Sequence, residues 1–329
     1  MQNKVKVGIV GGAGYTAGEL LRILINHPCA DIEFIYSTSN PGQPVYAIHS
    51  DLYGDTDLCF TNAIKPTDVL FLCLGHGVSR EFLSSNHLDA NTVVIDLGND
   101  FRIDTAFEKE GKSRNFVYGL PEINKHEIIH AENIANPGCF ATAIQLALLP
   151  LASENLLTNE VHINGVTGAT GAGRSLSETS HFSYRESNIS IYKAFTHQHL
   201  REINKTLTKV QGMVPELNFI PVRGNFTRGI FATAYTVCEK EENELIDLYK
   251  TFYAEHPFVH VVVDKSISLK DVINTNKCLL NINKHGNKML VTSIIDNLIK
   301  GASGQAVQNM NLIFGLKEDC GLRLKSSGF

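Results

Sequence analysis

The feature that most constrains the fold is a cluster of glycines near the N-terminus. The apolar segment Val5–Val10 is followed by Gly11-Gly12-Ala13-Gly14-Tyr15-Thr16-Ala17-Gly18, and a helical pattern then runs to a stop at His27-Pro28. The loop holds the G-x-G-x-x-G/A fingerprint, and it lies between a strand and a helix, which is the context that the fingerprint requires. Glycines let the backbone approach a pyrophosphate, and the N–H groups at a helix start favour its charge. The sequence therefore predicts a dinucleotide site, with an ordinary glycine-rich turn as the alternative. The predicted cofactor-binding residues are Gly11, Gly12, Ala13, Gly14, Tyr15 and Thr16.

The rest of the N-terminal part alternates strand and helix patterns. Strands are expected at Ile32–Ser37, Val69–Leu74 and Val93–Leu97, with helical stretches between them. Such alternation is typical of βαβ units with a parallel sheet. After about residue 138 the chain has longer apolar strands, including Val259–Val263 and Met289–Ile295. We expect an α/β protein with a Rossmann-type dinucleotide-binding domain followed by an α+β domain.

The end of the second strand bears on the choice of dinucleotide. An NAD site usually places Asp or Glu there, to hold the ribose hydroxyls. This chain instead has Ser37-Thr38-Ser39, whose hydroxyls can hydrogen-bond a 2′-phosphate. The sequence therefore favours NADP, while a polar loop without any ligand is the alternative.

The segment Asn136-Pro137-Gly138-Cys139 is the most informative one for chemistry. A turn at Pro137-Gly138 is followed by a helical pattern, so Cys139 lies at a predicted helix start. A thiol at that position ionises more readily, and thiolate is the nucleophile of covalent acyl transfer. We predict that Cys139 is the nucleophile. The remaining cysteines, for which we expect buried structural roles, are Cys29, Cys59, Cys73, Cys238, Cys278 and Cys320.

Histidine and arginine candidates follow in the second half. His199 and Glu202 share one face of a predicted helix, where they can form a base with its orienting carboxylate, and His197 lies beside them. No third cluster with metal-ligand spacing accompanies the histidines, so no metal is predicted. A second glycine-rich stretch ends at Arg174, and it is suited to an anion, as is Arg223. Surface histidines and arginines are the alternative.

Composition limits the partners and the compartment. The 329 residues carry a net charge of −5 and contain no apolar run long enough to span a bilayer, so neither a nucleic acid nor a membrane is expected as a partner. Seven scattered cysteines without a CxxC pair, and no secretory leader, indicate reduced thiols in the cytoplasm.

Several segments together resemble the N-acetyl-γ-glutamyl-phosphate reductase family, relatives of aspartate-semialdehyde dehydrogenase. Besides the loop at 11–20 and the cysteine segment, they are residues 75–79, 96–102, 118–122, 171–174, 197–203 and 296–309. The resemblance implies residues 1–138 plus 304–329 as an NADP-binding Rossmann domain and 139–303 as a catalytic and dimerisation domain of the semialdehyde dehydrogenase type. It also implies a homodimer or homotetramer.

The resemblance further implies an activity in arginine biosynthesis, the NADPH-dependent reduction of an acyl-phosphate substrate through a Cys139 thioester. His199, Glu202 and His197 are then the acid–base group. Gly171 and Asn297 join the cofactor site, and Arg102, Asn136, Arg174 and Arg223 are expected to bind the substrate. Arg201 is a further substrate candidate that comes from this chain's own sequence.

The identity of the acyl group stays open between N-acetyl and N-succinyl. The chain has Leu200-Arg201 where the family usually has Thr-Pro, and Arg201 can pair with the extra carboxylate of a succinyl group. Other functions consistent with these residues are an aspartate-semialdehyde or aminoadipyl-phosphate reductase and a non-catalytic NADP sensor. A sensor needs neither Cys139 nor His199.

Overall fold

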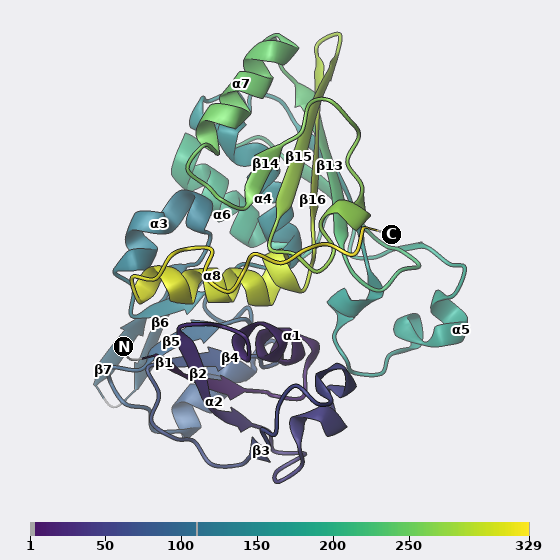
Figure 1. Cartoon of the computed structure of the whole chain (residues 1–329). Coiled ribbons are helices and arrows are strands. Elements are labelled where there is room, and N and C mark those ends of the chain that lie inside the picture. Colours follow the sequence, from purple (N-terminus) through teal and green to yellow (C-terminus); the bar gives the residue numbers. More distant parts are fainter. Residues whose placement is uncertain (1–3, 110, 329) are drawn as a thin grey trace. The chain divides into compact units, whose positions relative to one another are not determined.

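The structure, a computed structural model, describes residues 4–109 and 111–328. The chain divides into two compact units (Figure 1). The first unit comprises the chain up to residue 137 together with 302–323, and the second comprises 138–301 together with 324 onward. None of the described helices is long and apolar enough to cross a membrane.

The first unit is built around a parallel sheet of seven strands in the order β3-β2-β1-β4-β5-β9-β8. Strands β1, β4 and β9 are buried almost throughout, as expected where helices cover both faces of a parallel sheet. The elements of the sheet and its helices are β1 (Val5–Val10), α1 (Tyr15–Leu24), β2 (Ala30–Tyr36), β3 (Phe60–Thr61), β4 (Val69–Leu72), α2 (Val78–Ser85), β5 (Val93–Asp96), β8 (Val117–Tyr118), α3 (Pro121–Ile129), β9 (Asn133–Ala135) and α8 (Gly304–Ile313).

Three smaller features complete this unit. A separate antiparallel hairpin is formed by β6 (Ala106–Lys109) and β7 (Lys112–Asn115), and two 3₁₀ turns lie at Val45–Ala47 and Ser50–Leu52. The C-terminal helix α8 packs against α1 and α3 (Figure 1). This late segment of the chain therefore belongs to the same unit as the N-terminal part.

The second unit has a mixed sheet of seven strands in the order β11-β12-β10-β13-β16-β15-β14. Its elements are α4 (Cys139–Ser153), β10 (Val161–Thr167), α5 (Phe182–Arg185), β11 (Ser190–Ile191), α6 (His199–Gln211), β12 (Leu217–Arg223), β13 (Ile230–Val237), α7 (Glu242–Phe252), β14 (Val259–Val261), β15 (Cys278–His285) and β16 (Lys288–Ile295). Short 3₁₀ turns lie at Ala169–Ala172, Glu178–Ser180 and Leu269–Asp271, and a π-helical turn at Ile299–Ser303 leads into α8.

One face of the second sheet carries the core of this unit. Buried residues alternate with more exposed ones along β10 and β13, the pattern of a sheet covered on one side. The helix α4 packs on β13, β15 and β16 and also contacts α6 and α7, and Figure 1 shows these helices together. Because the sheet lies on one side of it and α6 and α7 also contact it, α4 is buried on nearly all sides.

The fold class expected from the sequence is confirmed, and the predicted strands lie within one or two residues of those observed. The last helix, α8, ends after Ile313 because Gly315 adopts a left-handed conformation (φ 64°). The expectation of six buried structural cysteines is wrong for Cys59, which is exposed because it precedes the short edge strand β3, where no further strand covers it. Only Cys238 and Cys278 are fully buried, and Cys29, Cys73 and Cys320 are half-buried.

Candidate active site

The loop between β1 and α1 has the geometry of a phosphate cradle. Both Gly11 and Gly12 donate their N–H groups to the carbonyl of Tyr36. A Cβ on Gly11 would lie 2.4 Å from the Cys73 carbonyl oxygen, so the close approach to the neighbouring strand requires glycine there, as does its φ of 81°. Gly14 is the N-cap of α1, and without a side chain it leaves the amides of the first turn uncapped. Uncapped amides at a helix start are suited to an anionic group such as a pyrophosphate.

The predicted ribose-phosphate residues lie at the carboxyl end of β2. Ser37 is buried, and its hydroxyl accepts a hydrogen bond from the Asn40 amide at 3.3 Å. Thr38 and Ser39 are exposed, so their hydroxyls are accessible from solvent. No acidic side chain stands at this strand end.

Cys139 is the first residue of α4 and is half-buried. Gly138 is the N-cap, and its carbonyl accepts the N–H of Thr142 at 2.8 Å. Glu202 accepts the N–H of Gly138 through Oε2 at 3.1 Å, so a buried carboxylate anchors the residue that precedes the cysteine. The placement of the thiol at a helix N-terminus favours its ionised form.

The two predicted histidines and the glutamate form a buried cluster in the second unit. His199 and Glu202 lie on the first turn of α6, with Nε2 of the histidine 3.9 Å from Oε1 of the glutamate. His197 accepts the N–H of His199 on its Nδ1 at 3.2 Å, which leaves its Nε2 as the protonated nitrogen of the neutral ring. Burial, with Lys193 and Arg223 nearby, lowers the pKa of His197 to about 4. The surface-histidine alternative is therefore excluded.

Tyr192 belongs to the same cluster, although the sequence did not single it out. The Arg223 guanidinium lies 4.7 Å from the centre of its ring, and the His197 ring is in edge contact with it. Burial, followed by the negative charge of the Cys139 thiolate, raises the pKa of Tyr192 to about 12. This coupling brings Cys139, Tyr192 and Arg223 into one site, with Arg223 as its half-buried cation.

The other predicted residues have different surroundings. Arg102 is buried in the first unit, where its guanidinium donates to the carbonyls of Asn136 and Leu97. Asn136 also donates to the Ala302 carbonyl. Both residues thus shape the chain at the end of β9. Arg174 and Arg201 are exposed in the second unit.

Asn297 and the loop of Gly171 are neighbours within the second unit. The Asn297 amide donates to the Thr170 hydroxyl at 3.1 Å, and its oxygen accepts the N–H of Gly229 at 2.6 Å. The amide therefore joins the second glycine-rich stretch to the β12–β13 connection. Gly171 itself is exposed.

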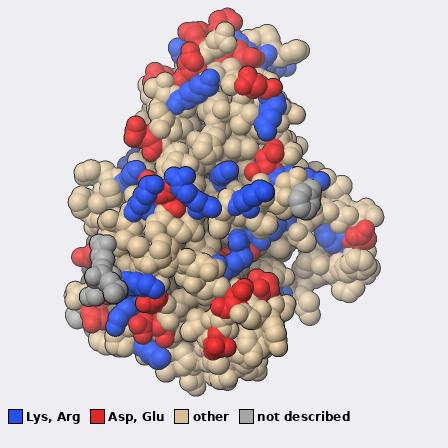
Figure 2. Space-filling model, in the orientation of Figure 1, with Lys and Arg blue, Asp and Glu red and all other residues tan. Residues whose placement is uncertain are grey.

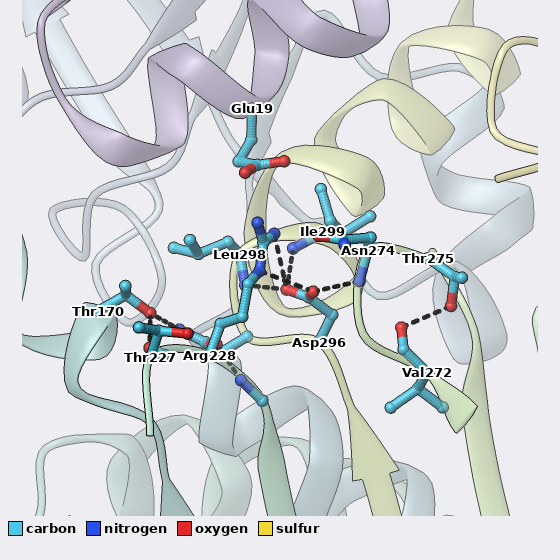
Figure 3. A network of polar contacts seen from close by, with 12 residues as sticks. Glu19, Thr170, Thr227, Arg228, Val272, Asn274, Thr275, Asp296, Leu298 and Ile299 are labelled. Carbon is cyan, nitrogen blue, oxygen red and sulfur yellow. Dashed lines mark hydrogen bonds and ion pairs between the residues drawn. The ribbon is translucent and has the colours of Figure 1, made fainter. Parts of the chain in front are cut away.

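A polar network centred on Asp296 lies at the end of β16 (Figure 3). Its Oδ2 accepts from the Arg228 Nε at 3.0 Å and from the Asn274 N–H at 2.7 Å. Its Oδ1 accepts from Arg228 Nη2 at 3.2 Å and from the N–H groups of Leu298 and Ile299 at 2.8 and 3.1 Å. This fully buried carboxylate thus fixes the chain that leaves the sheet toward the π-helical turn. The sequence marked Asp296 as the first residue of the segment 296–309 that carries the family resemblance, but it did not indicate this network.

The distribution of charged side chains and of potential metal ligands indicates no further site in the part of the chain that the structure describes. Basic and acidic side chains occur interspersed on the face drawn in Figure 2, consistent with the small net charge of −5. Among residues 4–109 and 111–328 there is no group of three His, Cys, Asp or Glu side chains arranged to hold a metal ion.

Two family models match the chain and define its class. Residues 6–131 match the semialdehyde dehydrogenase NAD binding domain, and residues 139–297 match the semialdehyde dehydrogenase dimerisation domain. Aspartate semialdehyde dehydrogenase II from Vibrio cholerae has a similar fold, with a TM-score of 0.74 and 16% identity over 95% of this chain and 99% of that chain. The enzyme from Candida albicans gives a TM-score of 0.69 with 12% identity over 95% and 99%. The fold and the matched domains are those of the semialdehyde dehydrogenases.

Much closer relatives identify the particular family. The N-acetyl-gamma-glutamyl-phosphate reductase of Flavobacterium johnsoniae is 59% identical over 99% of this chain and 100% of its own length. Those of Christiangramia forsetii and Phocaeicola vulgatus are 55% and 53% identical over the same shares. The chain belongs to the N-acetyl-gamma-glutamyl-phosphate reductase family.

Proposed function

We propose that this protein reduces an N-acyl-γ-glutamyl phosphate to the N-acyl glutamate 5-semialdehyde and phosphate, a step of arginine biosynthesis. The observation that carries this proposal is the full-length identity of 59% to a reductase of that name. The similar aspartate-semialdehyde enzymes are only 12–16% identical, so they support the fold and not their own substrate. An aminoadipyl substrate has no such support.

The chemistry is assigned to residues of the second unit. Cys139 thiolate attacks the acyl carbon, a C–S bond forms, and the C–O bond to phosphate breaks to release phosphate. A nicotinamide cofactor, when bound, would supply the hydride for reduction of the thioester. Backbone N–H groups at the start of α4 stabilise the tetrahedral oxyanion, and its collapse breaks the C–S bond and releases the aldehyde.

The acid–base role is assigned to His199, oriented by Glu202. Their ring and carboxylate are 3.9 Å apart, and the second carboxylate oxygen holds the N–H of Gly138 next to the nucleophile. Glu202 therefore links the orientation of the base to the position of Cys139. His197, neutral at pH 7, is assigned to the wall of the site with Tyr192, and Arg223 to the binding of the anionic substrate.

The matched family domain supports a nicotinamide dinucleotide as the cofactor, and we propose NADP in particular. The accessible hydroxyls of Thr38 and Ser39 and the absence of a carboxylate at the end of β2 favour a 2′-phosphate. Fluorescence titration of the protein with NADPH and NADH tests this directly. We expect NADPH to bind at least tenfold more tightly, and equal or tighter binding of NADH would reject the assignment.

The domains are assigned accordingly. We assign residues 1–138 with 304–329 to the NADP domain and 139–303 to the catalytic and dimerisation domain. The compact units differ slightly from this division, because residues 138 and 324–328 belong to the second unit and residues 302 and 303 to the first. The side of the second sheet away from α4 carries Tyr235, which is 46% exposed, and this side is the proposed contact of a homodimer or homotetramer. The protein is assigned to the cytoplasm, in agreement with its seven free thiols.

The acyl group is best tested by side-by-side kinetics. The relatives' names favour N-acetyl, whereas Arg201, an exposed side chain on the first turn of α6, favours a further carboxylate. Phosphate-dependent NADP reduction is measured with N-acetyl and N-succinyl glutamate semialdehyde, using the protein and its Arg201→Ala variant. A preference for the acetyl compound that Arg201→Ala leaves unchanged rejects the succinyl substrate. A complete lack of activity with both compounds rejects the proposed function.

A further inference from the structure

The turn at Ile299–Ser303 approaches the nucleophile more closely than any side chain would allow. A Cβ placed on Gly301 would lie 2.7 Å from the Cβ of Cys139 and 3.2 Å from its Cα. Contacts below 3 Å between such carbons do not occur without movement. The φ of Gly301 is not in the left-handed region, so close contact, and not backbone conformation, requires glycine here.

Two groups of Asp296 hold this turn in place. Its backbone carbonyl accepts the N–H of Gly301 at 2.9 Å, and its side chain accepts the N–H groups of Leu298 and Ile299. The carboxylate is in turn fixed by two hydrogen bonds from Arg228 and one from the N–H of Asn274 (Figure 3). Because every bond to this buried carboxylate is charge-assisted, the turn is anchored more firmly than neutral bonds would hold it.

The other side of Cys139 is anchored independently. Glu202 holds Gly138 from α6, and the Thr142 N–H closes the first turn of α4 on the Gly138 carbonyl. The backbone of Cys139 therefore lies between a residue fixed by Glu202 and a turn fixed by Asp296. A shift of either support moves the thiol relative to the helix amides that stabilise its charge.

We propose that Asp296 and Gly301 are positioning residues that hold Cys139 at the start of α4 in its reactive orientation. This inference rests on the proposed function only for the role of the thiol in turnover. The reactivity of the thiol itself can be measured without any substrate.

The test is the rate at which iodoacetamide alkylates Cys139, followed by peptide mass spectrometry between pH 5 and 9. Exposed Cys59, in the first unit, is alkylated in the same sample and serves as the internal control. In Gly301→Ala we expect the rate at Cys139 to fall by roughly tenfold or more and its apparent pKa to rise, because the added methyl displaces the residue from the helix amides. The value of kcat should fall by up to about 100-fold, with NADPH affinity and KM nearly unchanged.

Two further variants keep the result interpretable. In Gly75→Ala the new Cβ meets nothing closer than 3.9 Å, so alkylation of Cys139 should match the wild type. Asp296→Asn retains an oxygen for Leu298 and Ile299 but loses the charge that Arg228 pairs with, so it should shift the alkylation profile in the same direction without adding volume. If Gly301→Ala does not fold, Asp296→Asn alone tests whether the turn positions the Cys139 thiol.

Unchanged alkylation and kcat in folded Gly301→Ala would overturn the inference, as would an equal loss of reactivity at Cys59 and Cys139. A Cys139→Ser variant that still turns over the acyl phosphate would refute the proposed function instead. The alkylation profiles would then still decide whether Gly301 positions the thiol.

Discussion

A buried carboxyl at the carboxyl edge of the first sheet gives a quantitative prediction for pH-dependent stability. Asp96 ends β5 and is fully buried. Its Oδ1 accepts from the Ser79 hydroxyl at 2.6 Å and from the Gly98 N–H at 3.0 Å, while its Oδ2 has no hydrogen-bond partner among the residues that the structure describes. Burial, only partly offset by these hydrogen bonds, raises the pKa of Asp96 from 3.8 to about 6.

The raised pKa determines the sign and the size of the effect. A carboxyl whose pKa is higher in the folded chain stabilises the fold fully below pH 3.8, and this contribution is lost as the pH rises through about 6. The difference between the two pKa values corresponds to about 3 kcal/mol, at about 1.36 kcal/mol for each pKa unit. For a unit of this size that is a shift in Tm of about 6 to 12 °C.

Replacing Asp96 by Asn removes the charge and keeps the oxygen that Ser79 and Gly98 bind. The gain in Tm of Asp96→Asn over the wild type should therefore be larger at pH 8 than at pH 4.5 by several degrees. Any constant cost of burying the amide cancels in this comparison. Scanning calorimetry measures both values, with Asp55→Asn at an exposed position as the control. The same difference in Tm at both pH values would refute the assignment of a raised pKa.

Three further predictions concern the second unit. His199→Asn should lower kcat by roughly 100-fold or more, as expected for a lost acid–base group, and His197→Asn should lower it less; steady-state kinetics that show only His197 to be essential would reverse the assignment. Because the pKa of His197 is lowered to about 4, the folded state should lose up to about 3 kcal/mol of stability as the pH falls from 6.5 toward 4, and urea unfolding of His197→Asn should lack this loss. Glu202→Gln keeps an acceptor for the Gly138 N–H but removes the charge beside His199, so kcat should fall while Tm changes little; a lower Tm with unchanged kcat would make Glu202 purely structural.

The sequence predicted those parts of the fold that depend on local pattern. The glycines at 11, 12 and 14 predict a tight turn between a strand and a helix, and the structure has that turn with Gly11 at positive φ. Cys139 after Pro137-Gly138 was expected at a helix start, and it is the first residue of α4. Both features are set by residues next to one another in the chain.

Contacts between distant segments were not predictable in the same way. Tyr192 meets Arg223 and His197 through the pairing of β11 with β12, and no local pattern marks it. Gly301 approaches Cys139 across 162 residues of the chain, and no local sequence pattern reveals this contact. The solvent exposure of a side chain was not predictable either, because it depends on which strand lies at the sheet edge. Cys59, next to the edge strand β3, is the example.

The most direct test of the account is whether Cys139 carries the acyl group. The protein is mixed with N-acetyl-γ-glutamyl phosphate without NADPH, quenched in acid and analysed by peptide mass spectrometry. The account predicts an acyl adduct on Cys139 and release of one equivalent of phosphate. In Cys139→Ser it predicts no adduct and no turnover, with NADPH binding unchanged. Near-normal turnover in Cys139→Ser, or an adduct on another residue, would contradict it.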